Sequence, residues 1–365
     1  MTRKKIPVTV LGATGAVGQK FVCLLANHPW FEVRRLAASE RSRGRRYEDV
    51  VGWHQREEIP EAAKGLVVQP CRPPLDCPIV FSALSSAVAG KVEEEFASKG
   101  CFVFSNARNH RMDRDVPLLI PELNPEHLDI LPFQKRRRAW SGALVTNPNC
   151  STIILALSLG PLYRQFGLES VQVVTLQAVS GAGYPGVASL DILGNVIPFI
   201  PGEEEKIETE PLKILGTVEN QRFEPADFTI SAQADRVPVT EGHLECVSVR
   251  LRQAATAEEA TRCWREFESP IRALRLPSAP RRPVIVLTGK DRPQPRLDGR
   301  NYNGMCALVG RVRPCSVLHI KYVVLGHNTI RGAAGASILN AELATRLGRI
   351  DSSPGWRARV GSQPS

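Results

Sequence analysis

Short apolar runs alternate with longer segments of helical periodicity through the first 150 residues of this 365-residue chain. The short runs are predicted as buried strands, and the segments between them as helices. Strands are expected at Val8–Leu11, Phe31–Ala38, Ile79–Leu84 and Phe102–Ser105, and helices at Val17–Ala26 and Ala87–Ser98. This order is typical of parallel βαβ units, and it predicts an α/β fold with a doubly wound parallel sheet.

The second half of the chain has a different pattern, in which long connections separate the strand-like runs. These runs lie at Ser170–Ala178, Leu244–Leu251, Val284–Thr288, Ala307–Val312 and Val317–Val324. They predict an α+β domain with a mostly antiparallel sheet. Between the halves, Pro132–Ser141 is predicted to be a polar, basic connection, and TNPNCSTIILALSLGPLY a polar loop that continues into an apolar helix. Arg331–Arg346 is predicted to be a helix.

Composition excludes several classes of protein. No run approaches the roughly 18 apolar residues of a membrane span, and the apolar stretch Ile6–Leu11 is too short for a signal peptide. A cytoplasmic protein without a membrane partner is therefore expected. The nine cysteines include no CxxC pair and no zinc spacing, so no metal site is predicted. The net charge is +10, but the basic clusters are not interleaved with aromatic residues, so no nucleic-acid partner is expected.

A glycine-rich turn, GATGAVG, follows the first predicted strand directly and places glycines at Gly12, Gly15 and Gly18. Such a turn lets the backbone approach a pyrophosphate, which then binds the free N–H groups at the helix N-terminus. The position of the turn predicts a Rossmann-type dinucleotide site. An ordinary glycine turn is the alternative, because the spacing is GxxGxxG rather than GxGxxG.

The residues after the second predicted strand bear on the choice of cofactor. An acid at this position favours NAD, whereas charged donors favour the 2′-phosphate of NADP. Ser39, Arg41 and Ser42 supply hydroxyl and guanidinium groups. NADP is therefore predicted, although Glu40 would favour NAD if its carboxylate pointed into the site.

Cys150 lies in NPNCST, at the start of a predicted helix. The helix dipole and free N–H groups stabilise a thiolate there, so a reactive cysteine with a lowered pKa is predicted. The alternative is an incidental cysteine beside Ser151 or Thr152 as the helix cap. His243, which follows a glycine at the start of a predicted strand, is the candidate base, although a lone histidine is more often a surface or core residue.

Seven motifs along the chain point to one family. In order they are GATGAVG, SNARNHRMDRDVPLLIPELN, NPNCST, QAVSGAG, GEEEKIETE, RVPVTEGH and GHNTIRGAAG. Together they closely resemble the aspartate-semialdehyde dehydrogenases of the archaeal and fungal type. The resemblance extends from about Ile6 to Leu347.

The resemblance implies a reaction and three catalytic residues. The chain would reduce L-aspartyl 4-phosphate to L-aspartate 4-semialdehyde with NADPH, reversibly, in the biosynthesis of lysine, methionine and threonine. Cys150 would form a covalent thioester, and His243 would be its acid/base partner. Gln177 would position the intermediate.

The resemblance also implies the binding residues. Arg236 would hold the α-carboxylate with its guanidinium fork. Glu203 would accept the ammonium group, although Glu204 and Glu205 leave this assignment open. The phosphate-binding residues would be Arg111, Asn149 and Lys206. The cofactor-binding residues would be Gly12, Ala13, Thr14, Gly15, Ala16, Val17, Ser39, Arg41, Ser42, Ser180, Gly181, Asn328 and Thr329.

On this resemblance, residues 1–149 form an NADP-binding domain that a C-terminal helix at about 327–350 completes. Residues 150–326 form a catalytic and oligomerisation domain, and 351–365 form a loose tail. A homodimer or homotetramer is implied. The nearest alternative is a malonyl-CoA reductase of the same superfamily, which would share Cys150 and His243 but would not need the ammonium site at Glu203. A non-catalytic nucleotide-binding regulator is the alternative from another class.

Overall fold

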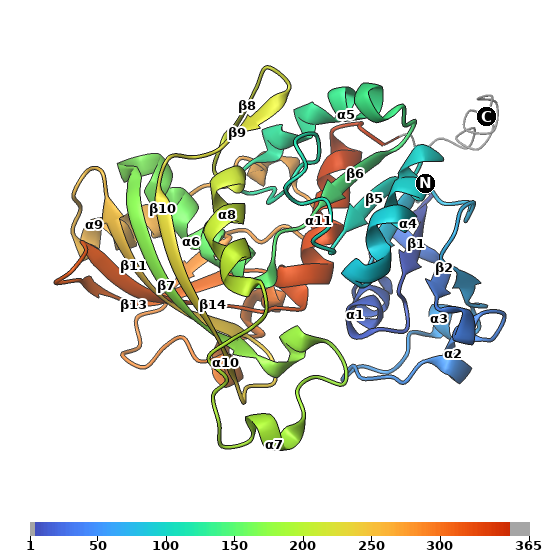
Figure 1. Cartoon of the computed structure of the whole chain (residues 1–365), viewed down its shortest axis with the longest axis horizontal. Helices are drawn as coiled ribbons and strands as arrows, with labels where there is room; N and C mark the ends of the chain where they lie inside the picture. Colours follow the sequence, from blue (N-terminus) through green and yellow to red (C-terminus); the bar gives the residue numbers. More distant parts are fainter. Residues whose placement is uncertain (1–3, 351–365) are drawn as a thin grey trace.

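The computed structural model of the protein describes residues 4–350, so the predicted tail at 351–365 lies outside the described residues. Two six-stranded sheets lie in the two halves of the molecule, the first on the right of Figure 1 and the second on the left. The first sheet is parallel throughout, in the order β3-β2-β1-β4-β5-β6. Its strands are β1 (Ile6–Leu11), β2 (Phe31–Ala38), β3 (Gln69–Pro70), β4 (Ile79–Ser82), β5 (Phe102–Ser105) and β6 (Ala143–Thr146).

Helices cover both faces of the first sheet. Alternate residues of its strands point to opposite faces, so a single strand contributes to the core on each side. On β4, Ile79 and Phe81 belong to the apolar core beneath α1 (Ala16–Leu25) and α11 (Gly335–Arg346). Val80 belongs to the separate core beneath α4 (Ser86–Ser98). The predicted doubly wound parallel sheet is therefore confirmed. The shorter helices of this half are α2 (Tyr47–Val50), α3 (Glu61–Lys64) and α5 (Leu131–Arg138).

The second sheet has the order β10-β7-β11-β14-β13-β12. The three central pairings are antiparallel and the two outer ones parallel, which confirms the predicted, mostly antiparallel sheet. Its strands are β7 (Leu168–Ala178), β10 (Thr229–Val237), β11 (His243–Leu251), β12 (Val284–Val286), β13 (Ala307–Pro314) and β14 (Ile320–Gly326). The remaining short elements are α7 (Ser189–Ile192), α10 (Pro295–Asp298), β8 (Thr217–Glu219) and β9 (Arg222–Glu224).

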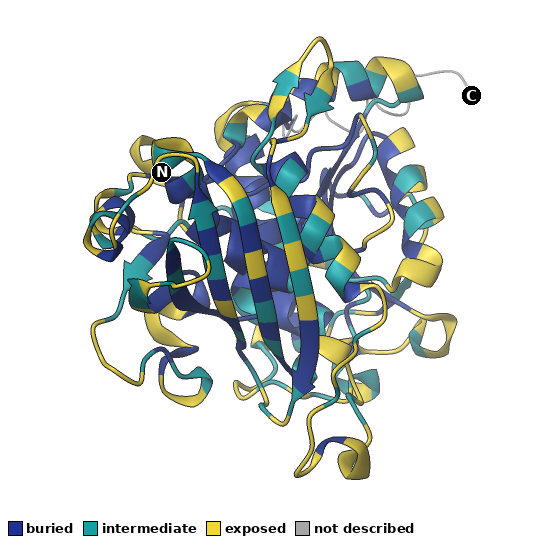
Figure 2. Cartoon of the chain, turned by 60° about the vertical axis from the view of Figure 1, so that its left-hand side comes forward, coloured by how far each residue is buried: buried dark blue, intermediate teal, exposed yellow. Residues whose placement is uncertain are grey.

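Three helices cover one face of the second sheet: α6 (Cys150–Phe166), α8 (Glu203–Ile214) and α9 (Ala257–Glu266). Among residues 4–350, no helix as long as these three lies on the opposite face. Along the strands at the front of Figure 2, buried residues alternate with exposed and half-buried ones, and on that face Leu308 and Leu325 form a small buried cluster with Cys306. On β7, for example, Val171 and Val173 are buried whereas Gln172 between them is exposed. Alternation of this kind is typical of a sheet with one covered face.

One prediction about the elements is wrong. The basic segment Pro132–Ser141 is not a connection, because most of it forms α5. Its helix is anchored from inside by Gln134, whose amide donates to the carbonyls of Asp115 and Leu144. The basic residues occupy the last turn, where positive charge is favourable beside the negative end of the helix dipole.

The link between β14 and α11 brings α11 back from the second half to the first sheet, near the centre of Figure 1. A π-helical turn, Ile330–Ala334, precedes α11, and Arg331 in this turn forms two hydrogen bonds of 2.7 and 2.8 Å with the carboxylate of Glu122. Both side chains are fully buried. None of the helices among residues 4–350 is long and apolar enough to cross a membrane.

We predict that Glu122→Gln lowers the free energy of unfolding by about 3–5 kcal/mol, since it leaves the buried Arg331 charge without a counter-ion. Urea denaturation followed by circular dichroism measures this change. Glu32→Gln, which breaks the exposed Glu32–Arg34 pair, is the matched control and should cost less than about 1 kcal/mol. Equal effects of the two substitutions would contradict the prediction.

Candidate active site

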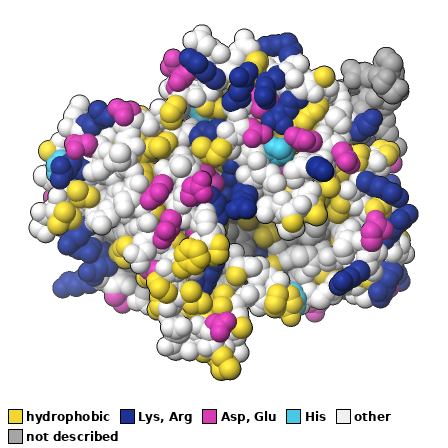
Figure 3. All heavy atoms as spheres, viewed as in Figure 1, with side chains coloured by type: hydrophobic (Ala, Val, Ile, Leu, Met, Phe, Trp, Pro, Cys, Tyr) yellow, Lys and Arg dark blue, Asp and Glu magenta, His cyan; other side chains and the backbone are white. Residues whose placement is uncertain are grey.

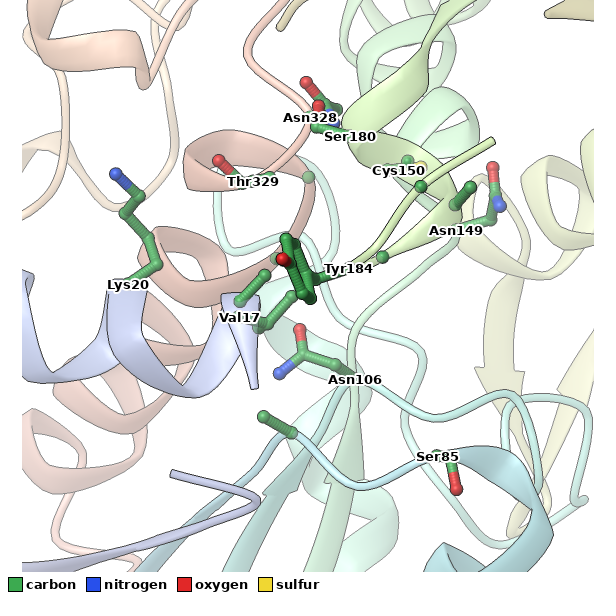
Figure 4. Close-up of a pocket in the computed structure, with 18 of the residues that line it drawn as sticks. Val17, Lys20, Ser85, Asn106, Asn149, Cys150, Ser180, Tyr184, Asn328 and Thr329 are labelled. Atoms are coloured by element: carbon green, nitrogen blue, oxygen red, sulfur yellow. Dashed lines mark hydrogen bonds between the residues drawn. The ribbon is translucent and has the colours of Figure 1, made fainter. Parts of the chain in front are cut away.

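A cavity of about 740 Å³ lies where the order of the first sheet reverses, at the carboxyl ends of β1 and β4. Ligands of doubly wound sheets bind at this switch point. Both halves of the molecule contribute to the wall of the cavity. The lining includes Ala16, Val17, Lys20, Ala83, Asn106, Arg111, Asn149, Cys150, Ser180, Gly181, Tyr184, Lys206, Asn328 and Thr329. In Figure 4, Cys150 and Asn149 lie across the cavity from Val17 and Lys20 of α1.

Cys150 is the first residue of α6. The cap of this helix is Asn149, whose side-chain oxygen accepts hydrogen bonds from the N–H groups of Ser151 and Thr152 at 2.9 and 3.1 Å. The possibility that Ser151 or Thr152 is the cap is therefore wrong. The π-helical turn approaches the cysteine closely, because a Cβ atom at Gly332 would lie 2.7 Å from the Cβ of Cys150.

The ring of His243 faces Cys150, with 3.2 Å between Nε2 and the thiol Sγ. On the other side of the ring, Nδ1 accepts a hydrogen bond of 3.1 Å from the backbone N–H of Ala178. A backbone N–H always donates, so Nδ1 carries no proton and the neutral imidazole has its proton on Nε2. The resting enzyme thus presents an N–H donor to the thiol rather than a lone pair.

Burial controls the protonation of this pair. It raises the pKa of the Cys150 thiol to about 12; Glu203 raises it further, while Lys206, Arg111 and Arg236 oppose the shift. Burial also lowers the pKa of His243 to about 3. Both groups are therefore neutral at neutral pH. The lowered thiol pKa predicted from the helix N-terminus is wrong for this state, because desolvation outweighs the favourable charges around the sulfur.

Glu203 is the buried carboxylate of the site. One oxygen accepts hydrogen bonds from the side chains of Asn149 at 2.7 Å and Gln177 at 3.1 Å, and the other is paired with Lys206. Burial alone would raise the pKa of Glu203, but the Lys206 charge and these hydrogen bonds outweigh it and lower the pKa. The neighbouring acids lie elsewhere: Glu204 accepts from the N–H of Ala234, and Glu205 is exposed beside a second cavity.

Glu210 and Lys213 continue the same face of α8 and were not predicted as site residues. Glu210 accepts from the guanidinium of Arg111 at 2.9 Å and from the backbone N–H of Asn149 at 2.6 Å. Lys213 donates to the carbonyls of Arg111, Asp113 and Val116, and burial lowers its pKa to about 7. A signal was available in GEEEKIETEPLKI, since alternating charges at 203, 206, 210 and 213 share one face of a helix.

Arg236, on β10, is not a lining residue of the cavity and lies behind Gly181, which is one. Its guanidinium donates to the carbonyl of Ala178 at 2.8 Å, and its backbone pairs with Ile197. Gly181 makes room for this side chain, because a Cβ atom there would lie 2.8 Å from Nη1 of Arg236 and 3.0 Å from Cε1 of His243. Burial lowers the pKa of Arg236.

The predicted glycine turn lies at the opposite side of the cavity. Gly12 has a φ of +71°, and a Cβ atom on it would lie 2.6 Å from the carbonyl oxygen of Ala83, so only glycine fits. Gly15 caps α1 without any side-chain hydrogen bond, which leaves the first N–H groups of that helix available to an anion. Between the turn and the cysteine, Asn328 donates to the hydroxyl of Ser180 at 2.9 Å (Figure 4).

The residues predicted to select the cofactor lie after β2 and do not line the cavity that holds Cys150. Glu40 pairs with Arg43 in solvent, so its carboxylate does not point into the site. Ser39 and Ser42 flank the same turn. Among residues 4–350, the side chain of Arg41 has no hydrogen-bond or ion-pair partner. A 2′-phosphate would meet an uncommitted guanidinium here.

Three further residues were not identified from the sequence. Tyr184 stacks on His54 with the ring centroids 3.9 Å apart, which links the second half to the first across the cavity. Glu245 lies two residues after His243 on the same buried face of β11, and neither carboxyl oxygen has a hydrogen-bond partner within the described part of the chain. Burial raises the pKa of Glu245 well above its usual range. Glu245 could have been identified from the sequence as an acidic residue at an inward-facing position of HLECVSVRL.

Comparison with known proteins gives consistent matches. Residues 7–131 match a family model described as "Semialdehyde dehydrogenase, NAD binding domain", and residues 159–331 one described as "Semialdehyde dehydrogenase, dimerisation domain". An aspartate-semialdehyde dehydrogenase of Archaeoglobus fulgidus is 54% identical over 92% of this chain and 97% of its own length. That of Saccharomyces cerevisiae is 45% identical over 94% and 98%.

Solved structures give the same result for the fold. The crystal structure of the Candida albicans aspartate-semialdehyde dehydrogenase with NADP superposes with a TM-score of 0.88 at 43% identity, covering 94% of this chain and 99% of that one. Aspartate-semialdehyde dehydrogenase II of Vibrio cholerae gives a TM-score of 0.75 at 28% identity, with the same coverage.

We predict that alkylation of Cys150 by iodoacetamide in the cofactor-free protein accelerates about tenfold per pH unit between about pH 6 and pH 10, without a plateau. Only the thiolate reacts, and a pKa of about 12 lies above this window. Mass spectrometry of the labelled peptides measures the rate. Cys315 is the internal control, because hydrogen bonds from the N–H groups of Leu318 and Val317 lower its pKa. An inflection for Cys150 below pH 8.5 would contradict the prediction.

Proposed function

The chain belongs to the aspartate-semialdehyde dehydrogenase family, and from this premise we propose that it reduces L-aspartyl 4-phosphate to L-aspartate 4-semialdehyde with NADPH, in the biosynthesis of lysine, methionine and threonine. The observation that carries the proposal is the contact between Cys150 and His243, within a ring of buried charges that match those of the substrate. The reaction is reversible with phosphate as co-substrate.

Cys150 is the nucleophile. Its sulfur attacks the acyl carbon, the S–C bond forms, and the C–O bond to phosphate breaks to leave a thioester. NADPH supplies the hydride that reduces the thioester. Gln177 holds the intermediate through its amide, which is itself fixed by Thr175 and Glu203.

His243 acts as a hydrogen-bond donor to the charge that develops during both half-reactions. Ala178 fixes the proton on Nε2, which faces the reacting sulfur. A donor at this position stabilises negative charge on the sulfur and on the oxygen of a tetrahedral intermediate, and can then deliver its proton. Of the acid and base roles that the family resemblance implies for His243, this arrangement supports the role of proton donor more directly.

The charged residues divide the substrate among them. Arg236 takes the α-carboxylate, which its planar fork suits, and Glu203 takes the ammonium. Arg111, Asn149 and Lys206 hold the phosphate. A malonyl-CoA substrate has no ammonium group for Glu203 to bind. The malonyl-CoA reductase alternative is not favoured, because the relatives that match over most of the chain are named aspartate-semialdehyde dehydrogenases.

The nucleotide would be held by residues of three segments. The turn from Gly12 to Val17 and the uncapped N-terminus of α1 fit the pyrophosphate. Ser39, Arg41 and Ser42 fit the 2′-phosphate, since Arg41 is uncommitted. The segments Ser180–Gly181 and Asn328–Thr329, which line the cavity beside Cys150, fit the nicotinamide end.

We propose that residues 1–149 form the NADP-binding domain and 150–326 the catalytic and oligomerisation domain. The C-terminal segment 327–350 completes the first domain; the support is that α11 contributes Ile338, Leu339 and Leu343 to the apolar core of the first sheet.

We also propose a homodimer that uses the second half of the chain, where the dimerisation-domain model matches. The face of the second sheet opposite α6, α8 and α9 offers one contact surface. The segment 183–200, termed the arm, offers another, because it projects at the bottom of Figure 1 and carries exposed apolar side chains there (Figure 3). These are Tyr184, Leu190, Leu193, Val196 and Phe199. Apolar side chains concentrated on one projection are typical of an interaction surface.

We predict that the purified protein reduces NADP with aspartate semialdehyde only when phosphate is present, and that NAD supports a slower rate. Absorbance at the nicotinamide band measures both. Cys150→Ala should abolish turnover and leave NADP affinity within about twofold, because the thiol lies at the reacting centre only. Turnover of malonyl-CoA in preference to aspartyl phosphate would refute the proposed substrate, and turnover by Cys150→Ala would refute the thioester.

We predict that the double variant Leu190→Asp, Leu193→Asp weakens self-association by at least about tenfold in sedimentation velocity experiments, because it places two charges in a desolvated contact. Leu190 is 91% exposed in the isolated chain, so the variant should still fold. Val317→Asp is the control, at a position that is 73% exposed and outside the arm. A wild-type monomer at micromolar concentration would refute the dimer, and unchanged association of the double variant would exclude the arm from it.

A further inference from the structure

A second cavity, of about 530 Å³, lies beside the active site on the side of α8. Ser86, Arg111 and Lys206 line both cavities, so the two spaces meet at the proposed phosphate-binding residues. Arg108 also lines both cavities, and its guanidinium lies near Gly202 at the start of α8. Figure 3 shows Lys and Arg side chains gathered in the hollow at the centre of this face.

Arg111 is the residue at the junction, and its binding capacity is not exhausted. Its two terminal nitrogens donate to Glu210 and to the carbonyl of Asn106. The side chain is only 9% exposed, and its third nitrogen, Nε, is buried and has no hydrogen-bond partner among residues 4–350. Each terminal nitrogen carries two hydrogens and donates only one of them within residues 4–350, so Arg111, which lines both cavities, can still donate to an anion there.

Arg108 adds a positive charge farther out. Its side chain is exposed, and within residues 4–350 it has no hydrogen-bond or ion-pair partner. The two carboxylates near the second cavity differ in their availability. Glu210 is engaged by Arg111 and Asn149, whereas Glu205 faces the cavity without such a partner.

We propose that the second cavity is a phosphate port, with Arg108 as its outer binding residue and Arg111 at its inner end. This inference rests on the proposed function. The cavity of Cys150 also receives the cofactor, whose binding segments line its other side, so a dianion released there needs a separate way out. The port takes inorganic phosphate, which leaves through it in the reductive direction and enters through it in the reverse direction.

The port agrees with the balance of the acyl-transfer step. As the S–C bond forms, the C–O bond breaks with both electrons on the phosphate oxygen, and the phosphate leaves toward Arg111 and Lys206. His243 already carries its proton on Nε2, so the thiol hydrogen is taken by the departing phosphate, which leaves as hydrogen phosphate. No other acceptor is needed.

The test is the Michaelis constant for phosphate in NADP reduction by aspartate semialdehyde. Arg108→Gln should raise it about tenfold, as expected for one lost charge-assisted hydrogen bond, and should leave the constants for NADP and semialdehyde within about twofold. Glu205→Gln should lower the constant for phosphate, since it removes a repelling charge from the same cavity. Arg114→Gln is the matched control, because Arg114 is exposed on the same loop over the ring of Phe133 and does not line the port.

Titration calorimetry with inorganic phosphate on the cofactor-free protein gives an independent measurement, in which Arg108→Gln should weaken binding by the same factor. An Arg108→Gln enzyme with unchanged phosphate constants overturns the port and leaves the proposed function intact. Equal effects of Arg108→Gln and Arg114→Gln would mean that the loss of one positive charge at long range explains the result, and this outcome would also overturn the port. A wild-type protein without phosphate-dependent turnover would instead refute the proposed function itself.

Discussion

The active site depends on the pairing of the charged side chains along one face of α8, which are largely shielded from water. Glu203, Lys206, Glu210 and Lys213 follow one another on that face, and each meets a partner of the opposite charge or a set of carbonyl groups. A buried charge without such a partner would cost several kcal/mol. The stripe therefore fixes the positions of groups from distant parts of the chain, among them the cap of α6 and the guanidinium of Arg111.

The same constraint explains how the half-buried nucleophile is held among these charges. Asn149 orients the first turn of α6 through its side chain, and its own N–H and amide are held by Glu210 and Glu203. The position of Cys150 is thus set by two carboxylates rather than by the helix alone. Its reactivity is set by the opposing effects of desolvation and of three nearby cations. A substrate that brings its own charges changes this balance at the moment of binding.

Much of this architecture could be predicted from local patterns. The strands β2 and β5 begin and end at the predicted residues. β5 is a fully buried apolar run, whereas β2 carries charged residues in its middle and is buried at Phe31 and from Leu36 to Ala38. The glycine turn and Cys150 were identifiable because their chemistry requires particular residues at particular junctions. What failed depended on tertiary contacts. Helix α5 is stabilised by Gln134 inside the fold, which periodicity does not reveal. The thiol pKa was predicted from the helix end alone, whereas burial by the rest of the chain decides it.

The return of α11 to the first sheet has a consequence for synthesis of the protein. Every residue from Gly335 to Ala344 is buried, and several pack in the core formed by β1, β4 and β5. A ribosome releases the chain from its N-terminus, so the first sheet emerges long before the helix that covers one of its faces. The nascent nucleotide-binding half must wait with an apolar surface in contact with water, and such surfaces aggregate or recruit chaperones. Folding of this half is therefore completed only after Gly335–Arg346 has been synthesised.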